Sequence, residues 1–326
     1  MPTIIDVAQR ANVSKSTVSR VVSGNGYVSS TSRQKVLTAM AELDYVPNVV
    51  ARNLQRGKTK TIGFIVHHFI DPLTIFLESF LAIAQKYEYT VTLFFTGGNQ
   101  QKEIDALNQL KFKQLDGLFI LTRSNDWSII EPYHHYGPIA TWHRVESTAL
   151  FSAYIDHYPG YLHTLDYLYA KGYRKIGHIL GNKRNLNTKA RIQALTDFEM
   201  THALPHRPEW LLYDRDEPNS GKRIAHIWHE FAEKPQALAF YTDIVAAECL
   251  SELQNLGYVI PRDVALIGFD NSKVSQLMQL TTIDYSLRKQ AENAFLYLYN
   301  QLNHQQLPYQ ELSFELIERE TVASLH

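Results

Sequence analysis

Four polar side chains near the amino terminus have the types and spacing needed to bind a nucleic acid. They are Lys15, Ser16, Thr17 and Arg20. In a helix, the neighbouring Val18 and Val21 turn toward the opposite, apolar face. Ammonium, guanidinium and hydroxyl groups donate hydrogen bonds to phosphate oxygens and to the edges of guanine and adenine. The pattern therefore predicts a short amphipathic helix that presents hydrogen-bond donors to a nucleic acid.

Two further helices are needed to position this one. The preceding helix has apolar residues at helical spacing, which are Ile4, Val7, Ala8 and Ala11. Ser14 follows a tight turn and is a natural N-cap for the second helix. A third helix is expected from about Ser30 or Thr31 to Leu43. Its expected core residues are Val36, Leu37, Met40 and Leu43. Residues 1–46 are therefore predicted to form a helix-turn-helix headpiece.

Charge is distributed unevenly along the 326 residues. Residues 1–60 hold nine Lys or Arg side chains and three Asp or Glu side chains, whereas the remaining residues hold 23 basic and 30 acidic side chains. The net charge of −1 therefore combines a basic amino-terminal part with an acidic body. Such a division is expected when one part of a protein binds phosphate and the other does not.

Short segments at fixed spacing then carry a family resemblance. They are Asp6–Ala8, Val13–Ser14, Thr17–Val21, Val28–Ser29, Thr31–Arg33, Leu43–Asn48 and Ala51–Leu54. Together they resemble the headpiece and hinge of the lactose-repressor (LacI/GalR) family of bacterial transcription regulators. By this resemblance Lys15 and Ser16 read base edges in the major groove, and Arg20 reads a base or contacts phosphate. The full set of DNA contacts that we expect is Thr3, Ser14, Lys15, Ser16, Thr17, Arg20, Asn48, Ala51, Arg52 and Leu54.

Residues 47–60 are expected to form a hinge helix and linker. The resemblance implies that the helix folds on operator DNA and that Leu54 enters the minor groove as a wedge. Val49, Val50 and Leu54 give the segment an apolar stripe, but it is shorter than the roughly 12–15 residues that an isolated helix needs. An ordinary linker helix is the alternative interpretation.

The rest of the chain alternates buried-type strands with helical patterns. The expected strands are Ile62–Val66, Val91–Phe95, Gly117–Leu121, Ile139–Trp142, Lys175–Leu180, Ala237–Tyr241 and Val264–Phe269. This alternation predicts parallel sheets covered by helices on both faces. Seven or more such units indicate two doubly wound parallel-sheet subdomains, with a ligand cleft beyond the carboxyl ends of their strands.

The resemblance extends over residues 61–326. Its landmarks are Pro138–Trp142, Gly172–Ile179, Pro261–Asp270, Leu280–Ile283 and Leu316–Val322. It implies a fold like that of periplasmic sugar-binding proteins, in which the chain crosses between subdomains near residues 157, 286 and 319. The expected N-subdomain is then about 61–156 and 287–318, and the C-subdomain is about 157–286 and 319–326.

The same resemblance implies which residues bind an effector. Arg191 matches an arginine that holds a sugar hydroxyl or carboxylate, and Asp270 matches an acid that accepts from ligand hydroxyls. Asp243 begins a helix, so it is either a ligand contact or an N-cap. The full set of effector contacts that we expect is Leu73, Thr74, Arg123, His143, Asn187, Arg191, Asp216, Asp243 and Asp270.

Several of these positions depart from the family pattern and bear on specificity. Leu73 and Thr74 stand where many relatives carry an aromatic pair, and Asp216 stands in the place of a stacking aromatic. His143 precedes Arg144 where an Asp-Arg pair is frequent. A cleft with Arg123, Arg191 and Lys189 would suit an anionic ligand such as a sugar phosphate. The alternative is that Arg123 and Lys189 are solvated rim residues.

Enzymatic and metal-binding functions find little support. The first strand has no glycine-rich dinucleotide motif after it, and no phosphate-binding loop of the Gly-x-x-x-x-Gly-Lys type occurs in the sequence. His226 and His229 are three residues apart, but no third ligand is placed by spacing, so we expect neither a metal site nor a cofactor. The lone Cys249 lies in an apolar helical run and is expected in the core. No secretion signal or membrane span is recognisable, which indicates a cytoplasmic protein.

The combined expectation is a transcriptional regulator that is not an enzyme. We expect a homodimer on a near-palindromic double-stranded operator, repressing a carbohydrate-utilisation operon under allosteric control by a sugar or sugar phosphate. The sequence leaves the sign of this control open. A nucleobase effector and a phosphocarrier protein as corepressor are alternatives. A sugar-binding protein without DNA function is a further one, although that would need a signal peptide and no helix-turn-helix.

Overall fold

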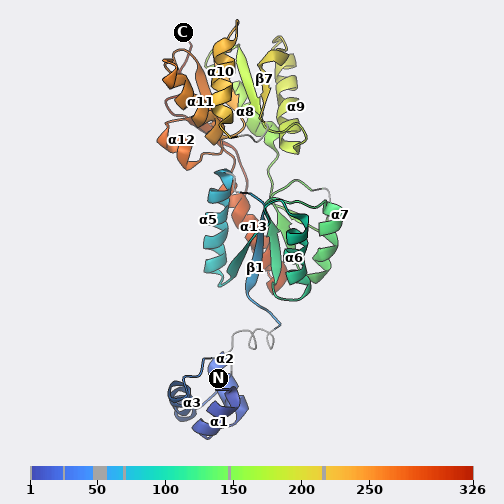
Figure 1. Cartoon of the computed structure of the whole chain (residues 1–326), viewed down its shortest axis with the longest axis vertical. Coiled ribbons are helices and arrows are strands. Elements are labelled where there is room, and N and C mark those ends of the chain that lie inside the picture. Colours follow the sequence, from blue (N-terminus) through green and yellow to red (C-terminus); the bar gives the residue numbers. More distant parts are fainter. Residues whose placement is uncertain are drawn as a thin grey trace.

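The computed structural model describes residues 2–24, 26–46, 57–68, 71–145, 148–214 and 218–325. Three bodies follow one another along the long axis of the molecule (Figure 1). The first is a small helical headpiece, and the other two are α/β bodies. The predicted hinge helix falls mainly on residues 47–56, which lie outside the described residues.

The headpiece has three helices, which are α1 (Ile4–Ala11), α2 (Lys15–Ser23) and α3 (Ser30–Glu42). Side-chain oxygens cap each helix at its amino end, from Thr3, Ser14 and Ser29 respectively. The fully buried valines of the shared core are Val7, Val18 and Val36. The prediction that Leu37 lies in this core is wrong, because its side chain is 47% exposed and Ala39 fills the inner position instead.

The first α/β body contains a five-stranded parallel sheet in the order β2-β1-β3-β4-β5. Its strands are β1 (Thr61–Val66), β2 (Thr90–Phe95), β3 (Gly117–Ile120), β4 (Ile139–Thr141) and β5 (Phe151–Ser152). Its helices are α5 (Asp71–Lys86), α6 (Gln100–Lys111), α7 (Trp127–Ile130), the 3-10 helix η1 (Glu131–Tyr136) and α13 (Leu287–Asn303). Apolar side chains of α5 and α13 form one core with the sheet, and those of α6 form a second core on its other face.

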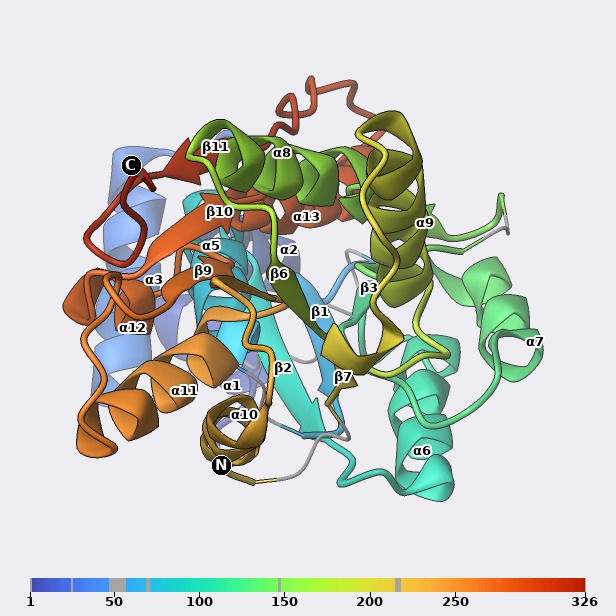
Figure 2. The ribbon, with the colours of Figure 1, turned by 90° about the horizontal axis from the view of Figure 1, so that it is seen from above.

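The second α/β body contains a six-stranded sheet in the order β11-β10-β9-β8-β6-β7, in which only β11 is antiparallel to its neighbour. Its strands are β6 (Ile176–Leu180), β7 (Leu211–Tyr213), β8 (Ala237–Phe240), β9 (Ala265–Phe269), β10 (Thr281–Asp284) and β11 (Glu315–Ile317). Its helices are α8 (His157–Ala170), α9 (Leu186–Thr201), the 3-10 helix η2 (Pro208–Trp210), α10 (Ser220–Glu230), α11 (Asp243–Asn255) and α12 (Lys273–Leu277). Helices α8 and α9 cover one face, and α10 and α11 cover the other (Figure 2).

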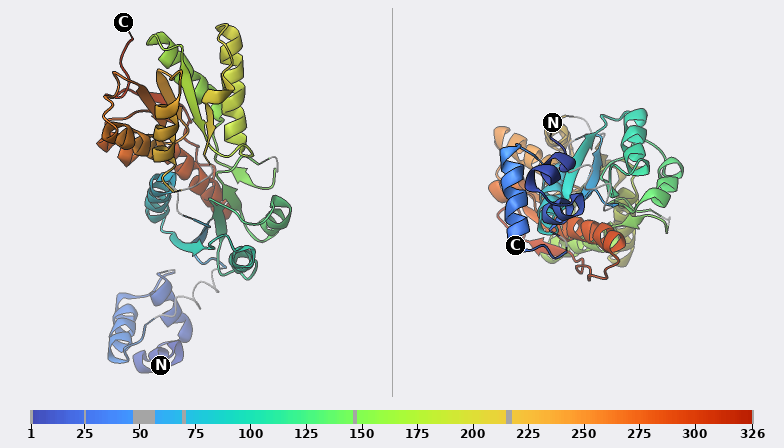
Figure 3. Two further views of the ribbon diagram at one scale, coloured as in Figure 1. Left: turned by 45° about the horizontal axis from the view of Figure 1, so that its top comes forward. Right: turned by 90° about the horizontal axis from the view of Figure 1, so that it is seen from below.

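The chain passes between the two bodies three times. It leaves the first body before α8, returns through α13, and enters the second sheet again at β11 (Figure 3). The crossings expected near 157 and 286 match the starts of α8 and α13. The third crossing was expected near 319, but Glu315–Ile317 already pair with β10, so the chain crosses earlier.

The chain enters the first sheet through a set of hydrogen bonds to Asp116. The backbone N–H groups of Thr59 and Lys60 donate to its two carboxylate oxygens at 2.7 and 2.8 Å, and the Thr59 hydroxyl donates at 2.9 Å. Lys58 Nζ donates to the Leu302 carbonyl at the end of α13 at 2.7 Å. The start of β1 is therefore fixed both to the loop before β3 and to α13.

Candidate functional site

The second headpiece helix presents an exposed polar face. Lys15, Ser16 and Arg20 are exposed, while Val18 and Val21 are buried beneath them. The Ser14 hydroxyl accepts a hydrogen bond from the Thr17 backbone N–H at 3.1 Å and lies 2.8 Å from both the Ser16 and Thr17 hydroxyls. The first turn of the helix is therefore held in place by Ser14, with its donors gathered at one end.

The two cations of this face, Lys15 and Arg20, differ from Arg10, which has a carboxylate partner. Arg10 forms an ion pair with Glu42 at 2.6 Å and so links α1 to α3. Within the described residues, Lys15 and Arg20 have no carboxylate partner. Thr3 is exposed at the start of α1, where it shares a capping box with Asp6. Backbone and hydroxyl donation by Thr3 lowers the pKa of Asp6.

The expected contacts Asn48, Ala51, Arg52 and Leu54 lie outside the described residues. The described part of the chain nevertheless brings five of the expected DNA contacts, Ser14 to Thr17 and Arg20, onto one short helix and its cap. An exposed helix face of hydroxyls and unpaired cations is chemically suited to phosphates and to major-groove base edges.

A second cluster lies at the carboxyl ends of β8 and β9. Arg191 of α9 is buried, and its Nη2 atom lies 3.0 Å from Nδ1 of His157. Its guanidinium carbon lies 4.3 Å from the centre of the Phe269 ring. Its Nε is buried and has no hydrogen-bond partner within the described residues. Burial lowers the pKa of Arg191. The cluster thus contains a buried cation with an unused donor.

Asp270 follows β9 and supplies a buried carboxyl group near this cation. It accepts a hydrogen bond from the Thr242 hydroxyl at 2.6 Å and one from the Asp243 backbone N–H at 3.3 Å. Burial raises the pKa of Asp270 well above its usual value, and the neighbouring Asp243 carboxylate raises it further. Asp270 has a φ of 136°, which is unfavourable for a residue with a Cβ. Strained backbone of this kind is typical of ligand sites.

Asp243 is not the N-cap of the helix that it begins. Thr242 is the N-cap of α11, and Asp243 is its first residue. The Asp243 carboxylate accepts hydrogen bonds from the Ser272 N–H and hydroxyl and from the Thr282 hydroxyl at 2.6–2.9 Å. A Cβ on Gly268 would lie 2.2 Å from Asp243 Oδ1, so glycine is required for this approach. Asp243 therefore joins α11 to the loops and strand around Asp270, and the N-cap interpretation is wrong.

Two residues of this cluster were missed in the sequence. His157 begins α8, and its ring stacks 5.1 Å from Phe269. Tyr285 follows β10, and its ring centre also lies 5.1 Å from Phe269. Burial lowers the pKa of His157 well below its usual value and raises that of Tyr285 well above it. Both residues lie at crossings between the two bodies, and this location was the signal that could have identified them.

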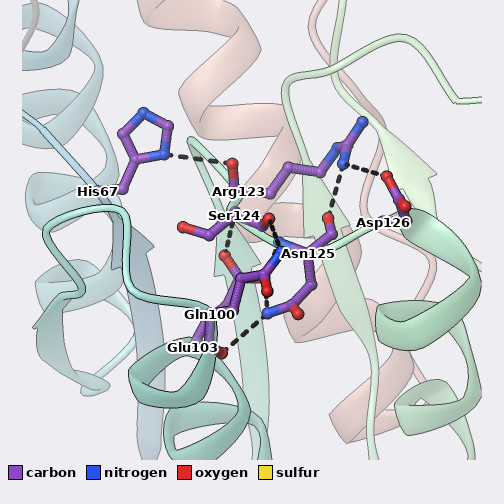
Figure 4. A network of polar contacts seen from close by, with 7 residues as sticks. All are labelled: His67, Gln100, Glu103, Arg123, Ser124, Asn125 and Asp126. Atoms are coloured by element: carbon purple, nitrogen blue, oxygen red, sulfur yellow. Dashed lines mark hydrogen bonds and ion pairs between the residues drawn. The ribbon is translucent and has the colours of Figure 1, made fainter.

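A separate network of polar contacts lies beside the first sheet, around the loop that follows β3 (Figure 4). Glu103 of α6 is fully buried and accepts from the backbone N–H groups of Ser124 and Asn125 at 2.6 and 3.0 Å. This fixes the loop after β3. Within it, Arg123 Nη1 donates to the Asn125 carbonyl at 2.6 Å, and the Arg123 carbonyl lies 3.2 Å from His67 Nδ1. The loop thereby holds Arg123 and His67 beside each other.

His143 follows β4 and lies next to this loop. Its ring centre is 5.8 Å from that of Trp127, on which Arg123 stacks at 4.9 Å. Burial lowers the pKa of His143 to about 4, and the charge of Arg123 contributes. His143 Nε2 is buried without a hydrogen-bond partner in the described part of the chain. Arg123 and His143 are therefore brought together around Trp127.

The remaining expected effector residues are more scattered. Leu73 is 1% exposed and packs in the core between α5 and the sheet, so its predicted ligand contact is not supported. Thr74 is exposed on α5, and Asn187 is half-buried near the start of α9. Lys189 is exposed, in agreement with the rim interpretation. Asp216 lies outside the described residues.

The two histidines of α10 each have a partner elsewhere in the second body. His226 lies 3.1 Å from Glu252 and His229 lies 2.7 Å from the Tyr258 hydroxyl. The described residues contain no group of three or more His, Cys, Asp or Glu side chains arranged to hold a metal ion. Cys249 is buried in the core, as predicted, and burial raises its pKa. No helix among the described residues is long and apolar enough to cross a membrane.

Comparisons with known proteins agree with this arrangement. Residues 3–48 match the family described as bacterial regulatory proteins, lacI family, and residues 165–322 match a periplasmic binding protein-like domain. The chain is 33% identical over 326 residues to the uncharacterized HTH-type transcriptional regulator YkvZ of Bacillus subtilis (strain 168), covering 99% of this chain and 100% of that protein. It is 30% identical over 340 residues to the HTH-type transcriptional repressor PurR of Vibrio vulnificus (strain CMCP6), covering 100% of both.

A solved structure gives the same result for the fold. The Lac repressor dimer bound to operator and the anti-inducer ONPF superposes with a TM-score of 0.85 at 23% identity, covering 99% of each chain. The predicted fold class, a helix-turn-helix headpiece with two parallel-sheet α/β subdomains, is thus confirmed. The chain belongs to the LacI family of bacterial regulatory proteins and is a DNA-binding transcriptional regulator.

Proposed function

We propose that this regulator represses a carbohydrate-utilisation operon as a homodimer on a near-palindromic operator, in the bacterial cytoplasm. The exposed, unpaired Lys15 and Arg20 on α2 support major-groove recognition by each headpiece. One headpiece buries little DNA surface, whereas a two-fold pair of headpieces reads two inverted half-sites. Asn48, Ala51 and Arg52 complete the contact through the hinge.

We infer that the effector is a sugar or a sugar phosphate bound between the two α/β bodies. The observation that carries this proposal is the buried Arg191, whose Nε has no partner, next to the buried Asp270 carboxyl. An unused guanidinium donor and a carboxyl acceptor can bind adjacent ligand hydroxyls or a ligand anion. His157 and Tyr285 orient these groups from the two crossings.

The first body supplies the opposite wall in this proposal. Arg123 offers donors for a phosphate or a ring hydroxyl, and the unpartnered Nε2 of the neutral His143 ring can accept from a ring hydroxyl. Thr74, which is exposed, and Asn187, which is half-buried, are further contacts in this proposal. Because Arg191 and Arg123 belong to different bodies, a ligand held by both favours one relative orientation of the bodies. That orientation is coupled through β1 to the hinge, and coupling of about 1–3 kcal/mol can either release or tighten operator binding.

The first test is a thermal-shift screen of the full chain with sugars, sugar phosphates, nucleosides and nucleobases. A ligand at a hundred times its dissociation constant adds about 2.7 kcal/mol of stability. A sugar or sugar-phosphate hit that changes affinity for an operator selected from random-sequence DNA supports the proposal. A nucleobase hit moves the assignment to that class. A complete absence of hits, with operator binding changed by a phosphocarrier protein, replaces the small-molecule effector by a protein corepressor.

A hinge variant tests the DNA part separately. Leu54→Ala removes the proposed minor-groove wedge, so specific operator affinity should fall by tenfold or more, which is about 1.4 kcal/mol. Affinity for random-sequence DNA should change little, since that affinity depends on phosphate contacts. Equal losses on both DNAs, measured by fluorescence anisotropy, would contradict the wedge assignment.

A further inference from the structure

The second α/β body contains a cavity of about 200 Å³ that the proposed function does not use. It lies between α8, α9 and the strands β6 and β7, near the amino-terminal ends of these strands. The cluster of Arg191 and Asp270, called the effector cluster below, lies at the carboxyl ends of the neighbouring strands β8 and β9, and so at the opposite end of the sheet. Apolar side chains form most of the cavity wall, including Leu165, Leu195, Phe198 and Trp210. The space equals roughly seven water volumes at about 30 Å³ each.

Besides the cations at its rim, the cavity is lined by three polar residues, which are His178, Glu199 and His206. His206 Nδ1 lies 2.8 Å from Glu199 Oε2, so these two are partners of each other. His178 lies in β6 between Ile176 and Leu180, which share its face of the sheet and belong to the apolar core there. It lines the cavity, and its Nδ1 lies 2.8 Å from the buried Tyr161 hydroxyl. When Tyr161 donates to Nδ1, the neutral ring carries its proton on Nε2. In the described part of the chain, Nε2 has no hydrogen-bond partner.

The rim of the cavity contains one cation that differs from its neighbours. Lys175 pairs with Glu233 at 2.8 Å, and Arg207 lies 3.3 and 3.4 Å from Glu209 and Glu233. Arg174, in contrast, has no carboxylate partner among the described residues.

The hydrogen bonds of Arg174 use only part of its guanidinium. Nη1 donates to the carbonyls of Tyr169 and Tyr173 at 2.7 and 3.0 Å, and the group stacks 3.5 Å from the centre of the Tyr169 ring. These contacts hold the guanidinium rigid while leaving Nε and Nη2 for another acceptor. A held but unpaired guanidinium is suited to a carboxylate.

We propose that this cavity is a second ligand site, which binds a small hydroxylated aromatic acid. The carboxylate pairs with Arg174 at the rim, the ring lies among Leu165, Leu195 and Phe198, and the hydroxyl contacts His178. A mainly apolar pocket with the unpaired Arg174 at its rim and His178 in its wall fixes both the size and the direction of such a ligand. This proposal does not depend on the identity of the effector at Arg191.

The site is also connected to the effector cluster. Tyr161 contacts His178 through its hydroxyl, and its ring centre lies 6.0 Å from the guanidinium carbon of Arg191. A ligand on His178 therefore acts on a residue that packs against Arg191. Occupancy of the cavity is expected to change operator affinity through Tyr161.

Calorimetric titration of the full chain with 4-hydroxybenzoate tests the site. We expect saturable millimolar or tighter binding, with 4-hydroxybenzamide at least tenfold weaker because it lacks the charge. Arg174→Gln should weaken 4-hydroxybenzoate binding about tenfold, while the matched Lys222→Gln on exposed α10 should not. Leu195→Trp, which fills the cavity, should abolish binding. Because this core variant can also fail to fold, Arg174→Gln remains the deciding one.

Controls separate this site from the cleft. Arg191→Ala should leave 4-hydroxybenzoate binding unchanged. Absence of binding to the wild type, or loss of binding in Arg191→Ala with retention in Arg174→Gln, would overturn the proposal. The proposed connection to the effector cluster is tested with Tyr161→Phe. This variant should still bind 4-hydroxybenzoate, but the bound acid should no longer change its operator affinity. If bound 4-hydroxybenzoate does not change the operator affinity of the wild-type protein, the connection is refuted.

Discussion

The exposed polar face of α2 and the buried cluster around Arg191 both contain cations, but in opposite environments. Lys15 and Arg20 are exposed and unpaired, whereas Arg191 is buried beside His157 and Phe269. An exposed charge interacts weakly, is screened by salt, and acts together with many others. A buried charge interacts strongly, and losing it leaves its partners unsatisfied. The contrast predicts additive, moderate effects in the headpiece and single large effects in the core.

The largest effect should follow from removing the buried cation. Arg191→Ala should reduce affinity for the effector found by screening by about 2–5 kcal/mol, which abolishes the response at ordinary concentrations. Operator affinity without effector should stay near wild type. The matched control is Lys189→Ala, which removes an exposed cation from the same helix. An Arg191→Ala protein that responds normally would show that the ligand binds elsewhere.

A second large effect concerns stability in acid. Burial lowers the pKa of His178 to about 3, with the charge of His206 as a smaller cause. Between the unfolded value of about 6.5 and this folded value, the unfolded chain binds a proton that the folded chain does not. The free energy of unfolding should therefore fall by about 1.4 kcal/mol per pH unit as pH decreases through this range.

Urea unfolding at about pH 7 and about pH 5 measures this contribution. His178→Gln should reduce the pH dependence, whereas His226→Gln, at an exposed position, should not. An unchanged pH dependence in His178→Gln would mean that His178 is protonated alike in both states.

A moderate effect is expected on the recognition face. Lys15→Ala should cost about 1–3 kcal/mol for the selected operator and relax the base preference at one position of each half-site. Lys35→Ala is the control, since it removes an exposed cation from α3 of the same headpiece. It should weaken operator and random DNA alike. If Lys15→Ala also weakens both equally, Lys15 contacts phosphate and does not read bases.

The smallest effect should come from the headpiece ion pair. Arg10 and Glu42 lie 2.6 Å apart, but their side chains are 59% and 44% exposed. Glu42→Ala should lower headpiece stability by less than about 1 kcal/mol, as for other exposed pairs. Thermal unfolding followed by circular dichroism measures this. A much larger loss would show that the pair also fixes the packing of α1 on α3.

The sequence identified the central strands because buried parallel strands have continuous apolar runs. All seven expected strands are present within one or two residues. The short strands β5, β7 and β10 were not among the expected strands, since two to four residues give little periodic signal. The prediction for Leu37 was wrong because adjacent apolar residues on a helix point in different directions, so not all of them can face the core. Tertiary packing buries Val36 and Ala39 and leaves Leu37 exposed.

The candidate site was less accessible to sequence reasoning than the fold. Arg191 and Asp270 were identified from family motifs, and both are buried in one cluster. Their neighbours His157 and Tyr285 were missed because segments far apart in the chain bring them together. The N-cap interpretation of Asp243 was wrong, and its actual partners, Ser272 and Thr282, belong to another loop and strand. Such roles depend on tertiary contacts that local sequence does not encode.

The hydrogen bonds of Asp116 have a consequence for the reach of the headpiece. They fix Thr59 and Lys60 to the first sheet, and Lys58 is bonded to α13, so the connection from headpiece to core ends at residue 57. The length of a tether sets the effective concentration at which a second headpiece meets its half-site. Asp116→Ala would remove the bonds at Thr59 and Lys60 but leave Lys58 bonded to α13, so both anchors must be removed to lengthen the connection. Asp116 and Lys58 thereby set the point of the core from which the reach of the headpiece is measured.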